Sequence, residues 1–347
     1  MLNRLTYSEP ERLLHHGGGL RAVARQYDIP LSDWLDLSTG INPNGWSVPP
    51  VPASVWLRLP EEQDGLEQAA QDYYATECVL PVAGSQAAIQ MLPRLREPCR
   101  VCVLDPGYAE HLHAWQRSGH VVMPVSSDQL DDAAAQVDVM VVINPNNPTA
   151  MRFSLEQLLD WHAQLVARGG WLVVDEAFMD LTPAQSLTPL CQRPGLIVLR
   201  SLGKFFGLAG ARIGFVCAQS ELLARLKARL GPWSVNAPAR WVATAALQDY
   251  RWQAKTRQQL GQDCVRLGTL LTHSGLAPSG GCGLFQWLCT DQADEIHEAL
   301  ASLGVFTRLF NEPSSLRFGL PCSETDWRKL GQALKVVCIP DLEGDNA

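Results

Sequence analysis

The sequence predicts an α/β fold with a mostly parallel central sheet and a smaller α+β domain. A chain of 347 residues that is 46% hydrophobic and 18% charged is long enough for one sizeable core plus a smaller second domain. Helical stretches such as 154–168 lie between short apolar segments, an alternation typical of βαβ units. The apolar segments read as strands near 101–105, 120–125, 139–143, 171–175, 196–200 and 212–217.

The smaller domain is expected from the C-terminal part of the chain. Residues 220–230 have the spacing of an amphipathic helix, and Pro232 and Pro238 then interrupt the pattern, which indicates a domain joint. Helices are expected near 240–273 and 291–303, and short strands near 284–289 and 315–319.

Composition restricts the classes of partner. The formal net charge of -8 argues against broad binding to nucleic acid or to an anionic membrane. The longest apolar runs, such as 137–143, have the length of a strand and are far too short to cross a membrane. Ten cysteines without a signal-peptide pattern indicate reduced thiols, so we expect a cytoplasmic protein.

The most informative stretch, residues 201–214, places Lys204 among glycines and apolar residues. Such surroundings favour the neutral amine, which forms a Schiff base with an aldehyde. Ser201, three residues earlier, and Arg212, eight residues later, are suited to bind a phosphate. Together these three residues predict pyridoxal 5'-phosphate (PLP), although a lone lysine in a glycine-rich stretch is more often an ordinary loop residue.

Two neighbouring strands end in polar residues that suit the same cofactor. Asn147 follows the strand at 139–143 and is placed to donate to the phenolic O3' of PLP. Asp175 ends the strand at 171–175, where a carboxylate needs a partner, and the pyridine nitrogen of PLP supplies one. The alternatives are a turn in which Asn147 caps its own backbone, and a capping or metal-binding role for Asp175. No set of histidines and cysteines at ligand spacing supports a metal.

Two further segments add weaker signals. Gly84 and Ser85 open an apolar helical pattern, which puts free backbone N–H groups and a hydroxyl where a phosphate binds well. Tyr108 follows the strand at 101–105 and is able to stack on a flat ring. An ordinary helix cap and an exposed loop tyrosine are the alternatives.

Taken in chain order, these residues resemble the fold-type I PLP-dependent enzymes of the aspartate aminotransferase superfamily. The resemblance implies a central sheet covered by helices on both faces, and a homodimer with active sites near the subunit interface. It also implies an N-terminal segment 1–38 that joins the small domain, a large PLP-binding domain 39–235 and a small domain 236–347. The residue roles that it implies are Lys204 as the Schiff-base lysine, Asp175 at the pyridine nitrogen, Asn147 at O3', Ser85, Ser201 and Arg212 around the phosphate, Gly84 and Gln86 as backbone donors, and Arg317 at the substrate carboxylate.

Within the superfamily, the chain most resembles the threonine-phosphate decarboxylases of cobalamin (vitamin B12) biosynthesis. The pointers are the segments 16–19 (His-Gly-Gly-Gly) and 36–43, together with Phe178 where many aminotransferases carry a tyrosine. The resemblance implies a lyase that converts O-phospho-L-threonine to (R)-1-amino-2-propanol O-2-phosphate. The histidinol-phosphate aminotransferases are close relatives, and their reaction is the alternative. A non-catalytic PLP-fold module is a third possibility, which the intact set of Lys204, Asp175 and Arg317 disfavours.

A phosphothreonine presents two anions on opposite sides of Cα and therefore needs two binding sites. For the carboxylate we expect Arg317, with Asn42 as a neutral helper. For the phosphate the candidates are Arg308, His16 and the backbone of Gly17 and Gly18, because glycines let N–H groups approach an anion closely. A flexible N-terminal residue is the alternative for His16, and a surface ion pair is the alternative for Arg308.

Other reactive residue types are assigned structural roles. His111 and His113 are expected to be surface or half-buried helix residues. Cys99 and Cys102 have redox or metal spacing, but they run into an apolar strand and no second such pair exists, so buried structural thiols are favoured.

Overall fold

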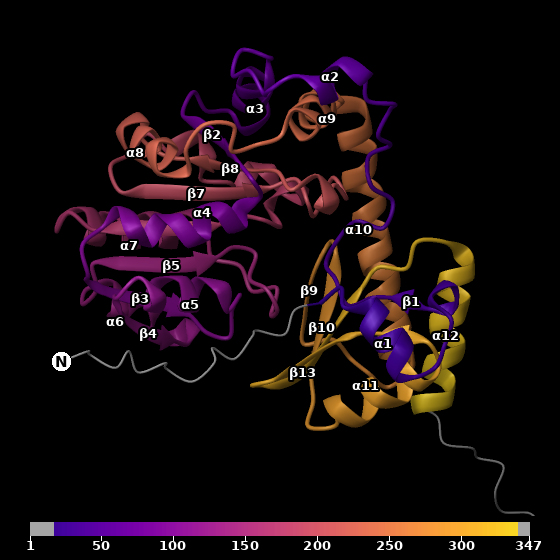
Figure 1. Cartoon of the computed structure of the whole chain (residues 1–347). Coiled ribbons are helices and arrows are strands. Elements are labelled where there is room, and N and C mark those ends of the chain that lie inside the picture. The colour runs from indigo at the N-terminus through magenta and orange to yellow at the C-terminus, as the bar shows by residue number, and fades with distance from the viewer. Residues whose placement is uncertain (1–16, 339–347) are drawn as a thin grey trace, which may run out of the picture.

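A computed structural model describes residues 17–338 and gives these residues a large sheet covered by helices, a separate small sheet of four strands and an isolated pair of strands (Figure 1). In the large sheet β8 is antiparallel to both of its neighbours, and every other described neighbouring pair is parallel. The mostly parallel sheet is thus confirmed. The strands, in spatial order, are β2 (Val79–Val82), β8 (Gly214–Cys217), β7 (Leu196–Ser201), β6 (Trp171–Asp175), β5 (Val139–Ile143), β3 (Arg100–Leu104) and β4 (Val121–Val125).

Alternate residues of the central strands face two separate cores. In β3, Val101 and Val103 pack in one core, and Cys102 and Leu104 pack in the other. This follows from the two-residue repeat of a strand, and it explains why strands buried on both faces are continuous apolar runs. One face is covered by α4 (Ser85–Met91), α5 (Glu110–Arg117) and α8 (Ser220–Leu230), and the other by α6 (Leu130–Ala134) and α7 (Leu155–Val166).

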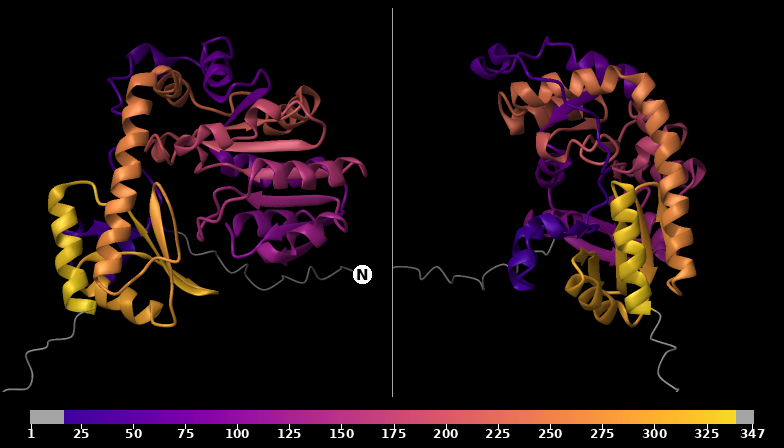
Figure 2. Two further views of the ribbon diagram at one scale, coloured as in Figure 1. Left: turned by 180° about the vertical axis from the view of Figure 1, so that it is seen from behind. Right: turned by 90° about the vertical axis from the view of Figure 1, so that its right-hand side faces the viewer.

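The small sheet is antiparallel and lies beside the lower part of the long helix α10 (Tyr250–His273), as Figures 1 and 2 show. The helical region expected near 240–273 is two helices, because the chain breaks at Asp249 between α9 (Ala237–Gln248) and α10. The elements of this part are β9 (Gly280–Cys282), β10 (Phe285–Cys289), α11 (Ala293–Ser302), β11 (Val305–Phe306), β12 (Arg308–Asn311), β13 (Ser314–Gly319) and α12 (Glu324–Cys338).

The N-terminal part of the described chain packs with the C-terminal part. After α1 (Leu20–Gln26), β1 (Leu35–Asp36) pairs in parallel with β11. The chain then passes to α2 (Ala53–Leu57) and α3 (Leu66–Tyr74), both of which contact α9. The domain boundaries at residues 38 and 235 stay a prediction. Within residues 17–338, no helix combines the length and the apolar character needed to cross a bilayer.

Candidate active site

The residues expected to bind a cofactor gather at one edge of the central sheet, where its parallel strands end. Ile143 and Asp175, the last residues of β5 and β6, are register partners. Ser201 ends β7 and pairs with Gly214 at the start of β8. Lys204 lies in the turn that follows β7. This edge is where ligands bind in open α/β sheets.

Lys204 is held in surroundings that favour its neutral form. Its carbonyl accepts hydrogen bonds from the N–H groups of Asn42 and Gly207, at 3.0 and 3.1 Å, which fixes the turn. Its Nζ atom lies 5.5 Å from the centroid of the Phe178 ring. The pKa of the Lys204 ammonium is lowered to about 8, chiefly by burial and then by the charge of Arg317. A substantial fraction of this amine is therefore neutral just above physiological pH.

Asp175 is paired with a histidine that the sequence did not point to. Oδ2 of Asp175 lies 2.9 Å from Nε2 of His111, and Oδ1 accepts the N–H of Ala177 at 3.0 Å. Both side chains of the pair are buried, with relative exposures of 1% for His111 and 5% for Asp175. Two fixed contacts hold the carboxylate in one orientation at the end of β6.

The expectation that His111 is a surface or half-buried residue is therefore wrong. Along α5, Ala114 and Trp115 are buried together with His111. The helical repeat brings positions three and four residues apart to the same face. This spacing is the signal that would have identified His111 as a buried residue. His113 is half-buried, as expected.

The start of α4 and Arg212 approach each other closely. Gly84 has φ 72° and ψ 156°, a conformation that is essentially restricted to glycine. A Cβ atom on Gly84 would lie 2.8 Å from Nη2 of Arg212, and one on Gly214 would lie 2.7 Å from the backbone nitrogen of Ser85. Because β8 lies between β2 and β7, this arrangement brings Gly84, Ser85, Ser201 and Arg212 to one place. Backbone N–H groups, hydroxyls and a guanidinium are the donors that a phosphate needs.

Tyr108 and Gln86 form a hydrogen-bonded chain beside these donors. The Tyr108 hydroxyl donates to Oε1 of Gln86 at 3.3 Å, and Nε2 of Gln86 donates to Glu110 at 2.6 Å. Burial raises the pKa of Tyr108 to about 12, with smaller effects from Glu110 and Asp175. The phenol is thus protonated. Because the Gln86 side chain is engaged, only its backbone remains for the expected contact to phosphate.

Arg317 is a buried cation at the junction of the two sheets. Nη1 of Arg317 donates to Oδ1 of Asn147, and Nη2 donates to the carbonyl of Ser38 at 2.9 Å. Nε of Arg317 is buried without a hydrogen-bond partner among residues 17–338. The pKa of Arg317 is lowered to about 10 by burial and by Arg308, its register partner on β12. Two adjacent guanidinium groups make this region strongly attractive to anions.

Of the other residues expected to bind substrate, Asn42 and Gly18 make hydrogen bonds within the protein. The Asn42 amide donates to the carbonyl of Phe205 at 2.9 Å and accepts the N–H of Asn44 at 2.9 Å, so it supports the turn around Lys204. The Gly18 N–H donates to Oγ of Ser38 at 2.9 Å. His16 lies outside the described residues. The expected substrate roles of these residues stay predictions.

The polar groups of this site match the functional groups of PLP. It offers a largely desolvated amine on Lys204, a fixed carboxylate on Asp175, the amide of Asn147, and the cluster of phosphate donors around Arg212. Among residues 17–338, no group of three or more histidine, cysteine or acidic side chains is arranged to hold a metal ion. Cys102 is buried, as expected, while Cys99 is half-buried.

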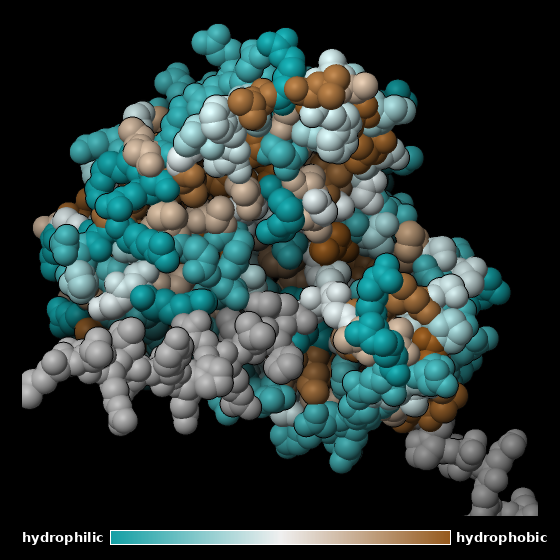
Figure 3. Space-filling model, in the orientation of Figure 1, coloured by the Kyte–Doolittle hydropathy of each residue, from teal (hydrophilic) through white to brown (hydrophobic). Residues whose placement is uncertain are grey.

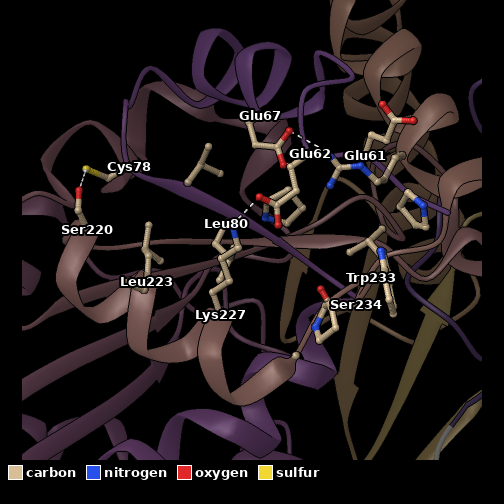
Figure 4. A pocket seen from close by; sticks show the side chains of 18 of the residues that line it. Glu61, Glu62, Glu67, Cys78, Leu80, Ser220, Leu223, Lys227, Trp233 and Ser234 are labelled. Atoms are coloured by element: carbon tan, nitrogen blue, oxygen red, sulfur yellow. Dashed lines mark hydrogen bonds and ion pairs between the residues drawn. The ribbon is translucent and has the colours of Figure 1, made fainter.

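A pocket lies between β2, α8 and the segment 60–67 (Figure 4). It is lined by several carboxylates, of which Glu62 is paired with Lys227 at 2.6 Å and Glu67 with Arg240 at 2.8 Å. The residues that line it include none of those around Lys204. Its carboxylates make it unsuitable for a doubly anionic substrate.

Comparisons with known proteins identify the family of the chain. The sequence profile of the aminotransferase class I and II family matches residues 34–334. The chain is 54% identical over 322 residues to a threonine-phosphate decarboxylase of Pseudomonas aeruginosa, covering 93% of this chain and 97% of that protein. It is 41% identical over 329 residues to a threonine-phosphate decarboxylase of a Sinorhizobium species, covering 92% and 97%. A crystal structure of histidinol-phosphate aminotransferase from Sinorhizobium meliloti in complex with PLP has a TM-score of 0.79 at 20% identity, covering 92% of this chain and 94% of that one.

Proposed function

The chain belongs to the class I and II aminotransferase family, and from that premise we propose that it is a PLP-dependent threonine-phosphate decarboxylase. The observation that carries the proposal is the pair of guanidinium groups, Arg308 and Arg317, on adjacent strands beside Lys204, whose pKa is lowered to about 8. Two adjacent cations suit a substrate that carries both a carboxylate and a phosphate. The relative of 54% identity carries the name of this activity.

Each part of the cofactor has a matching group in the site. Lys204 would hold it covalently, Asp175 would face the pyridine nitrogen, and the donors around Arg212 would bind the phosphate. When bound, PLP supplies an electron sink for the bond that breaks at Cα. The contact of His111 keeps the Asp175 carboxylate aimed in one direction.

Arg317 would bind the substrate carboxylate and set its orientation. Its Nε, which has no hydrogen-bond partner in the described part of the chain, and its contact with Asn147 place a rigid cation next to the cofactor residues. Orientation decides which bond at Cα breaks, because only a bond perpendicular to the cofactor ring delivers its electrons to the sink. When the carboxylate leaves as CO2, a proton must take its place on Cα. Lys204, with a pKa of about 8, is suited to deliver that proton.

The substrate phosphate would be held by Arg308 together with the glycine segment Gly17–Gly19. The pKa of Arg308 is lowered by burial, and a cation in such surroundings interacts strongly with an anion. His16 is a further candidate from the sequence. We place the reaction, conversion of O-phospho-L-threonine to (R)-1-amino-2-propanol O-2-phosphate, in cobalamin biosynthesis, as the sequence resemblance implies.

We also propose that the enzyme is a cytoplasmic homodimer. Four of the twelve large apolar side chains that are exposed among residues 17–338 lie in one short segment around α2, and Figure 3 shows apolar surface over this end of the molecule. Such clusters on a soluble chain are typical of protein interfaces. Sedimentation at nanomolar concentration tests this point, and a fully active monomer would contradict it. The four exposed residues of this segment are Val48, Trp56, Leu57 and Leu59.

The decisive experiment offers two substrates to the purified holoenzyme. O-phospho-L-threonine should release CO2 and the amino alcohol phosphate, whereas histidinol phosphate with 2-oxoglutarate should give no glutamate. Lys204→Ala should abolish turnover and the lysine-linked cofactor. Lys227→Ala, which removes an exposed lysine paired with Glu62, is the matched control. Glutamate formation without CO2 release would contradict the proposal and would indicate a histidinol-phosphate aminotransferase instead.

A further inference from the structure

A fully buried serine contacts both segments that we assign to the substrate anions. Ser38 follows β1, and its relative exposure is 0%. Its carbonyl accepts a hydrogen bond from Nη2 of Arg317 at 2.9 Å. Its hydroxyl oxygen accepts the N–H of Gly18 at 2.9 Å. One residue therefore joins the carboxylate-binding arginine to the N-terminal glycine segment.

The orientation of the Ser38 hydroxyl is fixed by a neighbouring carboxylate. Both the N–H and the hydroxyl of Ser38 donate to Oδ1 of Asp36, at 2.9 and 2.6 Å. A serine hydroxyl has one hydrogen, and here it is used on Asp36. The oxygen must then act as an acceptor toward Gly18. Asp36 thus orients the Ser38 hydroxyl as well as its backbone.

The glycine segment is in contact with the backbone of Ser38. A Cβ atom on Gly17 would lie 2.4 Å from the Ser38 carbonyl oxygen, so a side chain there would force the segment away. Gly18 has φ 87°, which side chains rarely tolerate. Close backbone approach and one directed hydrogen bond together hold the segment in place over Ser38.

We propose that Ser38 is a positioning residue that fixes the glycine segment relative to Arg317, so that the substrate phosphate and carboxylate are bound at a set distance from each other. The inference rests on the proposed function, because it assigns the glycine segment to the phosphate. Since the Gly18 N–H is donated to Ser38, the direct phosphate contacts come from the rest of the segment and from Arg308. Holding the segment before substrate arrives removes part of the entropic cost of binding.

The two contacts of Ser38 are separable by mutation. Ser38→Ala removes the acceptor for Gly18 but keeps the backbone carbonyl that accepts from Arg317. We expect KM for O-phospho-L-threonine to rise about three- to tenfold, as for one lost hydrogen bond, with little change in kcat. Binding of O-phosphoethanolamine, which has a phosphate and no carboxylate, should weaken to the same extent. Binding of L-threonine, which has only the carboxylate, should not change.

Two substitutions of Asp36, one that keeps an acceptor oxygen and one that removes it, provide a second test. Asp36→Asn retains an oxygen acceptor for Ser38 and should behave like the wild type. Asp36→Ala removes the acceptor for both Ser38 donors, so it should weaken binding of O-phosphoethanolamine and of L-threonine alike. The control is Ser32→Ala in the same N-terminal part, where the hydroxyl contacts only the exposed side chain of Asp33 at 3.1 Å among the described residues.

Hydrogen exchange supplies a readout that does not depend on turnover. In the holoenzyme without substrate, amides of residues 17–26 should exchange faster in Ser38→Ala than in the wild type or Ser32→Ala. Unchanged exchange, or equal weakening of L-threonine and O-phosphoethanolamine in Ser38→Ala, would overturn the inference. A wild-type enzyme that does not decarboxylate phosphothreonine would instead overturn the proposed function, and the exchange data would still report on the Ser38 contact.

Discussion

Nε2 of His111 lies 2.9 Å from Oδ2 of Asp175, and both side chains are buried. Removing the imidazole leaves one oxygen of a buried carboxylate without its partner, which is unfavourable. We expect His111→Ala to lower kcat and the affinity for PLP by about tenfold each, the effect of one lost buried hydrogen bond to a charged group. Cofactor titration and steady-state kinetics measure the two effects. His113→Ala, a half-buried position on the same helix, is the control, and equal behaviour of the two variants would contradict the role.

The pKa of Lys204 predicts the pH dependence of cofactor attachment. Only the neutral amine reacts with an aldehyde, and the pKa of Lys204 is lowered to about 8. The rate of PLP attachment to the apoenzyme should therefore rise with pH and level off above about pH 8–9. With an ordinary lysine the rate would keep rising until the pH passes the usual lysine pKa. Stopped-flow absorbance measures it. Because Arg317 contributes to lowering this pKa, Arg317→Met should shift the profile to higher pH, and an unshifted profile would exclude that coupling.

Gly84 is expected to be essential for phosphate binding because of its backbone conformation. Alanine at this position would adopt a strained conformation and press on Nη2 of Arg212 at 2.8 Å. The strain is on the order of 1–3 kcal/mol, so Gly84→Ala should weaken PLP binding by about 5- to 150-fold. Gly210→Ala, where a Cβ atom meets nothing within 4 Å, is the matched control. Equal PLP affinity of the two variants would contradict the argument.

Arg308 is expected to distinguish phosphorylated from unphosphorylated substrate. Loss of one charged contact to a phosphate in a desolvated site costs on the order of 2–5 kcal/mol. Arg308→Ala should therefore raise KM for O-phospho-L-threonine far more than it weakens binding of L-threonine. Arg328→Ala, at an exposed position on α12, serves as the control. Equal effects of Arg308→Ala on the two ligands would remove Arg308 from the phosphate site.

A buried ion-pair network behind the active site is expected to determine stability. Arg200 donates to Glu176 at 2.7 Å and to Asp180 at 2.5 Å, and all three side chains are at most 1% exposed. Arg200→Met leaves two buried carboxylates without their cation, which should lower the free energy of unfolding by about 3–5 kcal/mol. Denaturant unfolding measures it. Arg58→Met breaks an exposed pair with Glu61 and should change stability by less than about 1 kcal/mol. A similarly small effect at Arg200 would contradict the prediction.

The central sheet was predictable because its strands appear in the sequence as short runs of apolar residues. Five of the six expected strands correspond to β3 through β7, whose residues follow one another as apolar runs. The sixth begins only at Gly214, because Arg212 adopts a left-handed conformation before β8. β2 was missed because it is short, only half-buried at its start and interrupted by Pro81.

The chemical character of the site was also present in the sequence. Lys204 lies among glycines and apolar residues, and its partial burial in the structure lowers its pKa. Asn147 follows one apolar strand and Asp175 ends the next, and the parallel pairing of β5 with β6 brings the ends of these strands together. These inferences needed only the order of residues along the chain and the rule that parallel strands end at one edge.

The pairing of residues that are distant in the chain depends on the tertiary structure. His111 and Asp175 are 64 residues apart in the chain, Ser38 and Arg317 are 279 apart, and no local pattern pairs them. The strand β1 joins β11 although both are only two residues long, too short for a periodic signal. Local patterns along the chain predict which face of each element is buried and which residue types stand at the end of each strand. The contacts between those elements depend on how the elements pack, and packing is a property of the whole chain rather than of any segment of it.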